Sequence, residues 1–355
     1  MSGSSINSNQ ENTVVLKFGG SSIRTKEGFE KALQHIQKGL LRGNKVVCVV
    51  SAMGRKGDAY ATDTLRNLIG NYVTKKEQDR LISVGETISS VVFADFLIQK
   101  GIQAISLSTY EIGIITDTIF SNANIVAMDD SYLRSYLFTH DVLVVPGFQG
   151  ITKKGDVTTL GRGGSDTTAI ILGIQLNAKE IRIVSDVDGI YSGDPRIVKN
   201  AYRYPYINYE QLETITRNGS KVLHEKAAKI ASKHQAPIIF THIDYDDQMT
   251  SVIKGHIPLF NITAKHNYYR FQIEEAIEHQ LAEFYLGDYY VSVEDGELFI
   301  QWLVEQEIPH QKTLGYSKIS ILIDHGKLET KSAYVKNEEL IESLNLLHDL
   351  YLYKG

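Results

Sequence analysis

The chain has 355 residues, enough for two domains or for one large domain with a sizeable hydrophobic core. Its 43% hydrophobic and 22% charged residues exclude a disordered, collagen-like or coiled-coil protein. The formal net charge of −5 argues against a nucleic-acid binder with a broad basic face, because neutralising phosphates requires clustered Lys and Arg. Small anionic ligands remain compatible with this charge balance.

The N-terminal residues 1–12 are rich in Ser, Asn and Gln and lack the apolar segment of a secretory signal, so we expect a disordered leader. The single cysteine, Cys48, lies in an apolar run, which predicts a buried strand position rather than a nucleophile. No apolar run approaches the roughly 20 residues of a membrane span. The sequence therefore predicts a cytoplasmic protein without membrane contact.

From residue 13 to about residue 253, β-branched runs alternate with helical patterns, which indicates a parallel α/β sheet covered by helices on both faces. The expected strands are Val14–Phe18, Lys45–Ser51, Ala104–Ser108, Val142–Gly147, Ile181–Ser185 and Pro237–Thr241. The expected helices are Thr25–Leu41, Glu77–Lys100, Ser131–Thr139, Asp166–Leu176, Tyr209–Asn218 and Glu225–His234. In such sheets the ligand binds at the carboxyl ends of the strands.

After about residue 253 the glycine clusters end and tyrosines become frequent, which indicates a second, smaller α+β unit of about 100 residues. Its expected strands are Tyr268–Ile273 and Lys318–Asp324, and its expected helices are Glu274–Leu286, Leu298–Glu305 and Asn337–Leu350. We therefore expect domains at residues 13–253 and 254–355.

The first expected strand runs into the turn Gly19-Gly20-Ser21-Ser22, and a helix follows. Glycines let backbone N–H groups approach an anion, the helix N-terminus favours negative charge, and Lys17 adds a cation. The spacing is not that of a P-loop, and no G-x-G-x-x-G follows the strand, which argues against a dinucleotide-binding oxidoreductase. The turn is a candidate phosphate site, with an ordinary connection as the alternative.

A second glycine-rich segment, Gly161 to Ala169, carries Arg162, Ser165 and Asp166 just before an apolar helix. It combines a guanidinium fork for a carboxylate or phosphate with N–H donors and a carboxylate at one helix start. An ordinary helix N-cap is the alternative for Asp166, but the Arg-Gly-Gly-Ser-Asp context favours a functional role.

The segment Ser185 to Arg196 gathers turn-forming residues around Tyr191 after another expected strand. Asp186 and Asp188 lack the spaced ligands of an EF-hand, so contact with a nucleotide base and ribose is favoured over calcium. The eleven histidines form no H-E-x-x-H pattern or Cys/His cluster, and no G-x-S-x-G elbow occurs, which disfavours zinc and covalent catalysis. Positional and electrostatic catalysis, as in phosphoryl transfer, is favoured instead.

Six segments occur in order between about residues 13 and 250: Lys17 to Ser22, Val50 to Gly54 with Ala61-Thr62-Asp63, Ser83 to Glu86, Gly161 to Ala169, Ser185 to Arg196, and Asn218 to His224. Together they resemble the aspartokinases of the amino acid kinase family, and the Arg55-Lys56-Gly57-Asp58 insertion resembles the Bacillus diaminopimelate-sensitive type. The chain departs from the family's pattern at Ser21 and Ser185, where Thr is usual, and at Glu225, where proline is usual. The resemblance implies a three-layer αβα fold with a mainly parallel central sheet and a smaller C-terminal α+β ACT-like domain.

The resemblance also implies an activity and a set of site residues. The activity is transfer of the ATP γ-phosphoryl group to the β-carboxylate of L-aspartate, giving 4-phospho-L-aspartate for lysine, threonine, methionine and diaminopimelate synthesis. The implied catalytic residues are Lys17, Asp166 and Lys221. The implied substrate contacts are Glu86 at the α-ammonium, Arg162 at the α-carboxylate, and Ser51, Thr62 and Ser165 at the side-chain carboxylate. The implied ATP contacts are Lys17, Gly19, Gly20, Ser21, Ser185, Asp186, Tyr191, Arg196 and Lys221, with Mg²⁺ held through the ATP phosphates and not by protein ligands.

The region after residue 253 is shorter than the pair of ACT modules that the resemblance implies. Glu297–Ile323 is similar to the later part of such a module, whereas Phe271 to Glu275, expected to begin a helix, replaces the turn that normally receives an amino-acid effector. We therefore expect a homodimer formed through this region, in preference to retained feedback inhibition.

Two alternative functions stay open at this point. One is a kinase for another amino acid or analogue in a specialised pathway. The other is a non-catalytic regulatory paralogue that kept the fold; it predicts damage at Lys17, Glu86, Arg162, Asp166 or Lys221, and all five residues are present.

Overall fold

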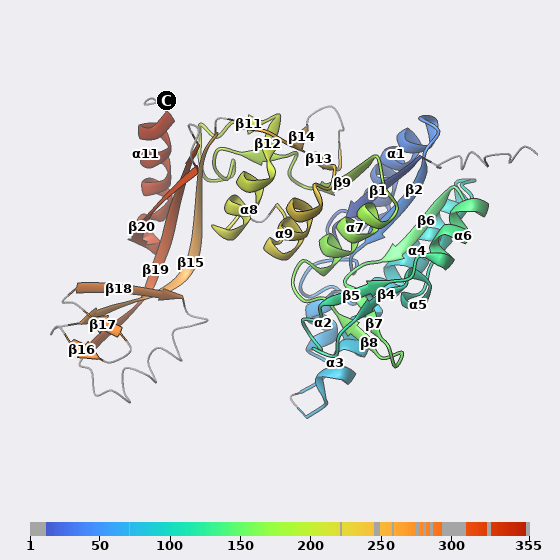
Figure 1. Cartoon of the computed structure of the whole chain (residues 1–355), viewed down its shortest axis with the longest axis horizontal. Coiled ribbons are helices and arrows are strands. Elements are labelled where there is room, and N and C mark those ends of the chain that lie inside the picture. Colours follow the sequence, from blue (N-terminus) through green and yellow to red (C-terminus); the bar gives the residue numbers. More distant parts are fainter. Residues whose placement is uncertain are drawn as a thin grey trace, which may run out of the picture. The chain divides into compact units, whose positions relative to one another are not determined.

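The structure is a computed structural model (Figure 1) that describes residues 12–70, 72–220, 222–244, 249–257, 259–273, 277–279, 282–284, 287–292, 310–324 and 328–352. The expected leader, apart from Asn12, and the expected helix Leu298–Glu305 lie outside these residues. The chain divides into two compact units. The first takes its residues from Met1–Ile190, Pro205–Glu213 and Lys221–Gly255, and the second from Tyr191–Tyr204, Thr214–Ser220 and His256–Gly355.

The first unit is built on an eight-stranded sheet in the order β12-β14-β13-β9-β1-β2-β6-β3. All neighbouring pairs are parallel except β13 and β14. The strands are β1 (Thr13–Phe18), β2 (Lys45–Val50), β3 (Ala104–Ser106), β6 (Val142–Pro146), β9 (Glu180–Ser185), β12 (Tyr206–Asn208), β13 (Ile238–His242) and β14 (Met249–Ile253). The mainly parallel sheet is thus confirmed, and the six expected strands all occur with ends shifted by at most two residues.

Helices cover both faces of this sheet, and strands β1, β2 and β6 are therefore buried on both faces. Alternate residues such as Leu16 and Phe18 pack against Phe29 and Phe93, which come from α1 (Lys26–Leu41) and α4 (Val84–Gln99). The opposite face, which carries Lys17, packs against α7 (Gly164–Gln175). The expected three-layer αβα arrangement is confirmed. Cys48 is fully buried in β2, as expected, and burial raises the pKa of its thiol.

Local signals determine where several helices begin and end. The Thr25 hydroxyl accepts a hydrogen bond from Gly28 N at 3.2 Å and caps α1. The expected helix Glu77–Lys100 is two helices, α3 (Lys75–Ile82) and α4, that meet at Ser83. The start of α3 is set by Thr74 and Glu77, which form a capping box. The other helices of this part are α2 (Thr62–Arg66), α5 (Thr109–Ile112), α6 (Ser131–Thr139), α8 (Tyr209–Arg217) and α9 (Glu225–His234).

A second, four-stranded sheet in the first unit has the order β5-β4-β7-β8. Its strands are β4 (Ile114–Thr116), β5 (Ile125–Met128), β7 (Gln149–Thr152) and β8 (Val157–Thr159). The β7–β8 pair is an antiparallel hairpin. The strands of this small sheet are not among the expected ones, because they are too short to show an alternating pattern.

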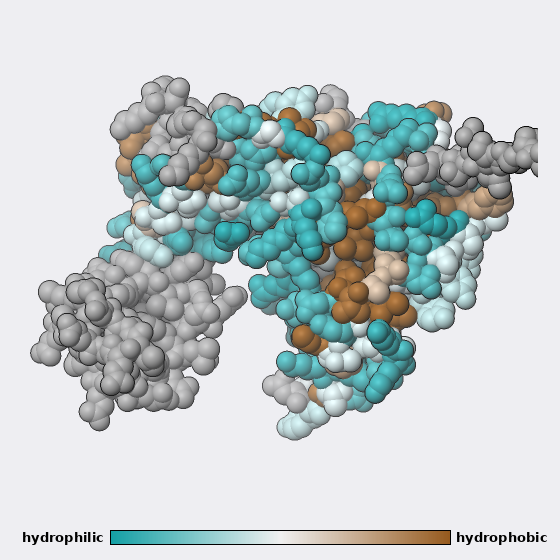
Figure 2. All heavy atoms as spheres, viewed as in Figure 1, coloured by the Kyte–Doolittle hydropathy of each residue, from teal (hydrophilic) through white to brown (hydrophobic). Residues whose placement is uncertain are grey.

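One helical stretch, Lys75–Gln99, is long and apolar enough to cross a membrane, contrary to the expectation from sequence. Of its most apolar window, 56% is buried inside the protein, which is typical of a core helix in a globular domain. Val84, Val91, Val92 and Ile98 of this stretch are exposed. On the face seen in Figure 2, hydrophilic residues cover most of the described surface of the first unit around a smaller hydrophobic area.

The second unit contains an antiparallel sheet in the order β18-β15-β19-β20. Ile319 and Ile321 alternate along β19 and pack with Leu340 and Leu344, four residues apart on α11. The elements are β10 (Ile190–Tyr191, shared with the first unit), β11 (Arg203–Tyr204), β15 (Leu259–Ile273), β16 (Ile277–His279), β17 (Ala282–Phe284), β18 (Gly287–Ser292), β19 (His310–Asp324), β20 (Leu328–Lys336), the 3₁₀ helix η1 (Asn337–Glu339) and α11 (Leu340–Leu352).

The helical expectation for this region is wrong, whereas its expected strands are confirmed. The range Glu274–Leu286, expected to be helical, contains the antiparallel strands β16 and β17. The expected strands Tyr268–Ile273 and Lys318–Asp324 are the last residues of β15 and β19, so no helix begins at Phe271 to Ile273, which pair with both β18 and β19. Pairing between β16 and β17 overrides the helical preference of the Glu- and Ala-containing segment. The expected C-terminal helix is confirmed as η1 followed by α11.

Candidate active site

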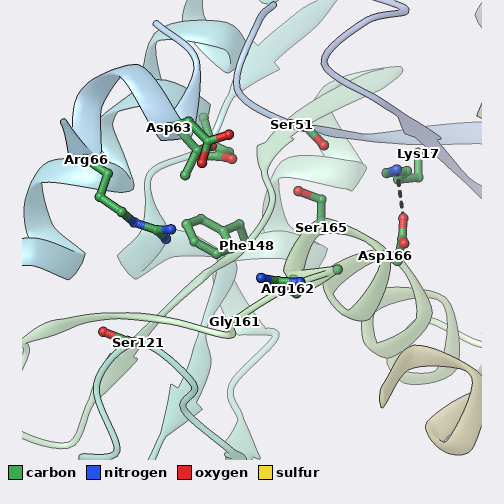
Figure 3. Close-up of a pocket in the computed structure, with 14 residues that line it drawn as sticks. Lys17, Ser51, Asp63, Arg66, Ser121, Phe148, Gly161, Arg162, Ser165 and Asp166 are labelled. Carbon is green, nitrogen blue, oxygen red and sulfur yellow. Dashed lines mark ion pairs between the residues drawn. The ribbon is translucent and has the colours of Figure 1, made fainter. Parts of the chain in front are cut away.

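A cavity of about 600 Å³ lies beside the carboxyl ends of β1 and β2 in the first unit (Figure 3). It brings together residues from β1, from the loop after β2, from α2 and α4, and from the glycine-rich segment before α7. Its lining residues are Lys17, Ser51, Thr62, Asp63, Arg66, Glu86, Ser121, Phe148, Gly161, Arg162, Gly163, Gly164, Ser165 and Asp166. The structure therefore places seven of the eight expected catalytic and substrate residues in one cavity. The eighth, Lys221, lies outside the described residues.

Lys17 and Asp166 form an ion pair at one end of the cavity, with 2.7 Å between Lys17 Nζ and Asp166 Oδ1 (Figure 3). Both side chains are mostly buried, at 14% and 12% exposure. Asp166 is the third residue of α7, whose N-cap is Gly163 and which has no side-chain cap hydrogen bond. The N-cap alternative for Asp166 is therefore wrong, and its carboxylate pairs with the lysine instead.

Glu86 is a different kind of carboxylate, held in the first turn of α4 at 3% exposure. Its Oε1 accepts a hydrogen bond from Ala52 N at 3.1 Å, whereas its Oε2 has no hydrogen-bond partner. Burial raises the pKa of Glu86 to about 8, and the hydrogen bond from Ala52 only partly opposes this. A buried carboxylate oxygen without a partner, on a residue that lines a cavity, is suited to bind a cation.

The glycine-rich segment presents Arg162 and Ser165 to the cavity. Gly163 has a φ of +67°, and a Cβ atom there would lie 2.0 Å from the Cβ of His224, so only glycine fits between α7 and this residue. Close packing of this kind fixes the path of the backbone from Arg162 into α7. Ser51 and Thr62 face the same cavity from the loop after β2 and from the start of α2.

Seven lining residues were absent from the predicted site residues: Gly161, Gly163 and Gly164 of the glycine-rich segment, and Asp63, Arg66, Ser121 and Phe148. Arg66 is exposed, and its guanidinium points toward Phe148 in Figure 3. Its position four residues after Thr62 was the available signal, because residues four apart share one face of a helix. Phe148 and Ser121 both have a φ of +72°, which side-chain-bearing residues rarely adopt, and such strained residues cluster at functional sites.

The turn after β1 adjoins this cavity through Lys17. A Cβ atom on Gly19 would lie 3.9 Å from Lys17 Nζ and 4.0 Å from Ser22 Oγ, and the buried Ser22 hydroxyl has no hydrogen-bond partner. A Cβ on Gly20 would lie 2.2 Å from the carbonyl oxygen of Ala52, so this turn requires glycine. The space beside Gly19 thus offers a cation and an unused hydroxyl, a donor set that suits phosphate oxygens.

The remaining expected nucleotide residues are distributed over both units. Ser185 ends β9, and its hydroxyl hydrogen-bonds Val187 in a local turn. The next residue, Asp186, forms an exposed ion pair with Arg55 at 3.4 Å.

In the second unit, the Tyr191 carbonyl accepts from Asn261 at 2.7 Å, and Arg196 forms a two-point ion pair with Asp194. Among the described residues, no group of three or more His, Cys, Asp or Glu side chains could hold a metal ion.

A profile of the amino acid kinase family matches residues 12–242. Aspartokinase 1 of Bacillus subtilis is 44% identical over 246 residues, which cover 68% of this chain and 61% of that protein. The aspartokinase of Geobacillus stearothermophilus is 39% identical over 63% of this chain and 55% of its own length. The chain thus matches less than two thirds of the length of these curated relatives.

The solved structure of Escherichia coli aspartokinase III in complex with aspartate and ADP is similar in fold, with a TM-score of 0.73. The alignment covers 95% of this chain and 99% of that chain at 19% sequence identity. At this identity the likeness establishes the fold alone, and the bound aspartate and ADP are ligands of the E. coli protein.

Proposed function

The chain belongs to the amino acid kinase family, and from that membership we propose that it transfers the γ-phosphoryl group of ATP to the β-carboxylate of L-aspartate. The product of this reaction is 4-phospho-L-aspartate. Relatives named aspartokinase support the proposal, as does the fold shared with a solved aspartokinase that holds aspartate and ADP.

The observation that carries the proposal is the distribution of charge in the cavity. The paired cation Lys17 lies at one end, and the buried carboxylate of Glu86 and the guanidinium of Arg162 line the same space. A free acidic amino acid has an ammonium group for Glu86, an α-carboxylate for Arg162 and a second carboxylate that can face Lys17. N-acylated amino acids and nucleotides lack the ammonium group and would leave Glu86 buried without a cation.

On the acceptor side, Glu86 binds the α-ammonium, Arg162 the α-carboxylate, and Ser51, Thr62 and Ser165 hold the side-chain carboxylate in this proposal. The acceptor needs no general base, because a carboxyl with a pKa of about 3.9 is already ionised at neutral pH. One carboxylate oxygen forms a bond to the γ-phosphorus while the bond between that phosphorus and the leaving ADP oxygen breaks. The protein has to bring two anions together in line.

On the phosphoryl side, Lys17 neutralises charge on the transferring group and Asp166 fixes its ammonium. The backbone of Gly19, Gly20 and Ser21 lies beside the phosphates, with Lys221 as a second cation. Mg²⁺, bound to the ATP phosphates, shields the phosphate charge when present. The oxygen-binding donor set beside Gly19 fits such a nucleotide, and no protein metal cluster is required.

The rest of the nucleotide is assigned to Ser185, Asp186, Tyr191 and Arg196. The exposed pairs of Asp186 with Arg55 and of Arg196 with Asp194 are weak enough to rearrange when a nucleotide binds.

The test is ADP release by the purified chain with MgATP and a panel of free amino acids. Aspartate should give turnover and an acyl phosphate that hydroxylamine traps. Turnover with another amino acid only would establish the alternative of a different amino acid kinase. Absence of turnover with every member of the panel would favour a non-catalytic paralogue.

For the whole chain, we propose a kinase domain at 13–253 and an ACT-like region at 254–355 that forms a homodimer, in a cytoplasmic protein. Sedimentation equilibrium measures the oligomeric state directly. Adding lysine, threonine or diaminopimelate to the ADP-release assay tests feedback, and we expect no inhibition by any of them.

A further inference from the structure

Asp79 is a fully buried carboxylate that does not line the cavity but lies one contact behind it. It belongs to α3, and its two oxygens take four hydrogen bonds. Oδ2 accepts from the backbone N–H groups of Ser121 and Thr159, both at 2.8 Å. Oδ1 accepts from the hydroxyl groups of the same two residues, at 3.2 and 3.0 Å. A carboxylate with this many donors is fully satisfied without an opposing side-chain charge.

The two residues that Asp79 holds belong to the wall of the cavity. Ser121 lines it directly, with the unusual φ of +72°. Thr159 ends β8 two residues before Gly161, which also lines it, and three before Arg162. The carboxylate of Asp79 therefore fixes the place where the chain leaves β8 toward Arg162.

A second side chain, on another helix, bonds to the same two parts of the chain, the loop that contains Ser121 and the segment that follows Thr159. Lys226, on α9, donates from Nζ to the carbonyl oxygens of Ala123 at 2.8 Å and Leu160 at 3.2 Å. The N–H of Ala123 also donates to the carbonyl of Thr159 at 2.9 Å. Asp79 and Lys226 thus hold the backbone around Ser121 and Ala123 and the backbone at Thr159 and Leu160. None of these hydrogen bonds involves the turn after β1.

We propose that Asp79 is a positioning residue for the amino-acid acceptor: it sets the positions of Ser121 and Arg162 and leaves the phosphoryl side unaffected. This inference rests on the proposed function for its kinetic readout. The hydrogen-bond pattern allows a discriminating design, because an Asn side chain can keep its carbonyl oxygen on the two N–H groups and donate to the two hydroxyls. A leucine fills a similar volume and leaves both N–H groups unpaired.

The experiment compares Asp79→Asn, Asp79→Leu and Thr159→Val with the unaltered protein, using MgATP and aspartate. Asp79→Leu should raise the KM for aspartate about tenfold or more and change the KM for ATP less than about twofold. In Asp79→Asn, the KM for aspartate and the KM for ATP should both stay within about threefold of the values of the unaltered protein. Thr159→Val removes one of the four bonds and should raise the KM for aspartate about threefold, which keeps the test available if Asp79→Leu does not fold. Glu77→Gln is the matched control, because that carboxylate caps the same helix in an exposed position.

Hydrogen exchange of the apo proteins provides a readout that does not depend on activity. Amides of residues 119–123 and 157–161 should exchange faster in Asp79→Leu than in Asp79→Asn, with β1 unchanged. If the unaltered protein does not turn over aspartate, the proposed function fails, and exchange alone decides the role of Asp79. Three results would each overturn the proposal. The first is an equal increase in the KM for aspartate and the KM for ATP in Asp79→Leu, and the second is no change in either KM in folded Asp79→Leu. The third is an increase in the KM for aspartate that is as large in Asp79→Asn as in Asp79→Leu.

Discussion

Two carboxylates that line the cavity are in opposite states, one in the part assigned to phosphoryl transfer, called the paired end, and one in the part assigned to the acceptor, called the unpaired end. Asp166 already has its cation, Lys17, at 2.7 Å, and is 9% exposed as a whole residue. Glu86 is buried deeper, at 3% exposure, and has one backbone donor and an oxygen without a partner. The carboxylate at the end assigned to phosphoryl transfer thus has its cation, whereas the carboxylate at the end assigned to the acceptor has none among the described residues.

This difference indicates how the two ends would use binding energy. A paired lysine costs no reorganisation when a phosphate arrives, which is what electrostatic stabilisation of a transition state requires. A buried carboxylate that lacks a cation instead contributes most binding free energy when the ligand supplies that cation. It therefore contributes selectivity for a ligand with a free amino group. Four changes would break or sharpen this contrast.

The largest expected effect is at the paired end. Lys17→Ala should lower kcat by about 10³-fold or more, because a cation on the transferring group is lost and Asp166 is left without its partner. The KM for aspartate should change much less. Lys45→Ala is the matched control: it removes an ion pair, with Asp141 at 3.1 Å, on the neighbouring strand β2. Near-normal turnover by folded Lys17→Ala would refute the role of this lysine.

At the unpaired end, Glu86→Gln should raise the KM for aspartate by about 10- to 100-fold, the range expected for a lost hydrogen bond between charged groups. Its kcat at saturating aspartate should fall less than that of Lys17→Ala. Glu111→Gln is a suitable control, because Glu111 bonds Ser108 and Tyr136 and does not line the cavity. An unchanged KM in Glu86→Gln would mean that another group binds the ammonium.

The same carboxylate predicts a dependence on pH. Burial raises the pKa of Glu86 from its ordinary 4.5 to about 8, so between these values the folded protein holds a proton that the unfolded chain has released. Its contribution to the free energy of unfolding therefore falls as pH rises from about 4.5 to 8. Binding of an ammonium requires the ionised form, so aspartate should bind more tightly at pH 8.5 than at pH 6.5 and release a proton.

Calorimetric titration of aspartate in two buffers of different ionisation enthalpy measures that proton. At pH 7, we expect release of close to one proton from the unaltered protein and almost none from Glu86→Gln. Equal proton release by the two proteins would assign the titration to another group.

The contrast between the two ends also separates what the sequence could predict from what it could not. The turn after β1 and the segment before α7 carry their chemistry in local patterns, so Lys17, Arg162 and Asp166 were correctly expected in one site. Burial is a property of the tertiary fold, however, and no local pattern reveals that Glu86 has an unpartnered oxygen or that Asp79 is fully buried.

The same reason explains the errors in the fold. The expected strands of the central sheet are apolar on both faces and could be identified from composition alone. The small sheet of β4, β5, β7 and β8 and the strands β16 and β17 are three or four residues long, and pairing with distant segments determines them. Phe148 was missed because its place in the cavity depends on a backbone conformation at +72° that its residue type does not favour.

The smallest expected effect concerns Arg66, an exposed residue on the rim beside Phe148. It adds a positive charge to the cavity, and its guanidinium has no ion-pair partner among the described residues within 4.0 Å. Solvent screens an exposed charge, so Arg66→Gln should raise the KM for aspartate only about two- to fivefold. The increase should shrink as salt is added, whereas the effect of Glu86→Gln should persist because that group is buried. Arg134→Gln, which removes an exposed pair with Asp130 outside the cavity, is the control. A salt-independent effect as large as that of Glu86→Gln would place Arg66 in direct contact with the acceptor and make the acceptor end a two-arginine site.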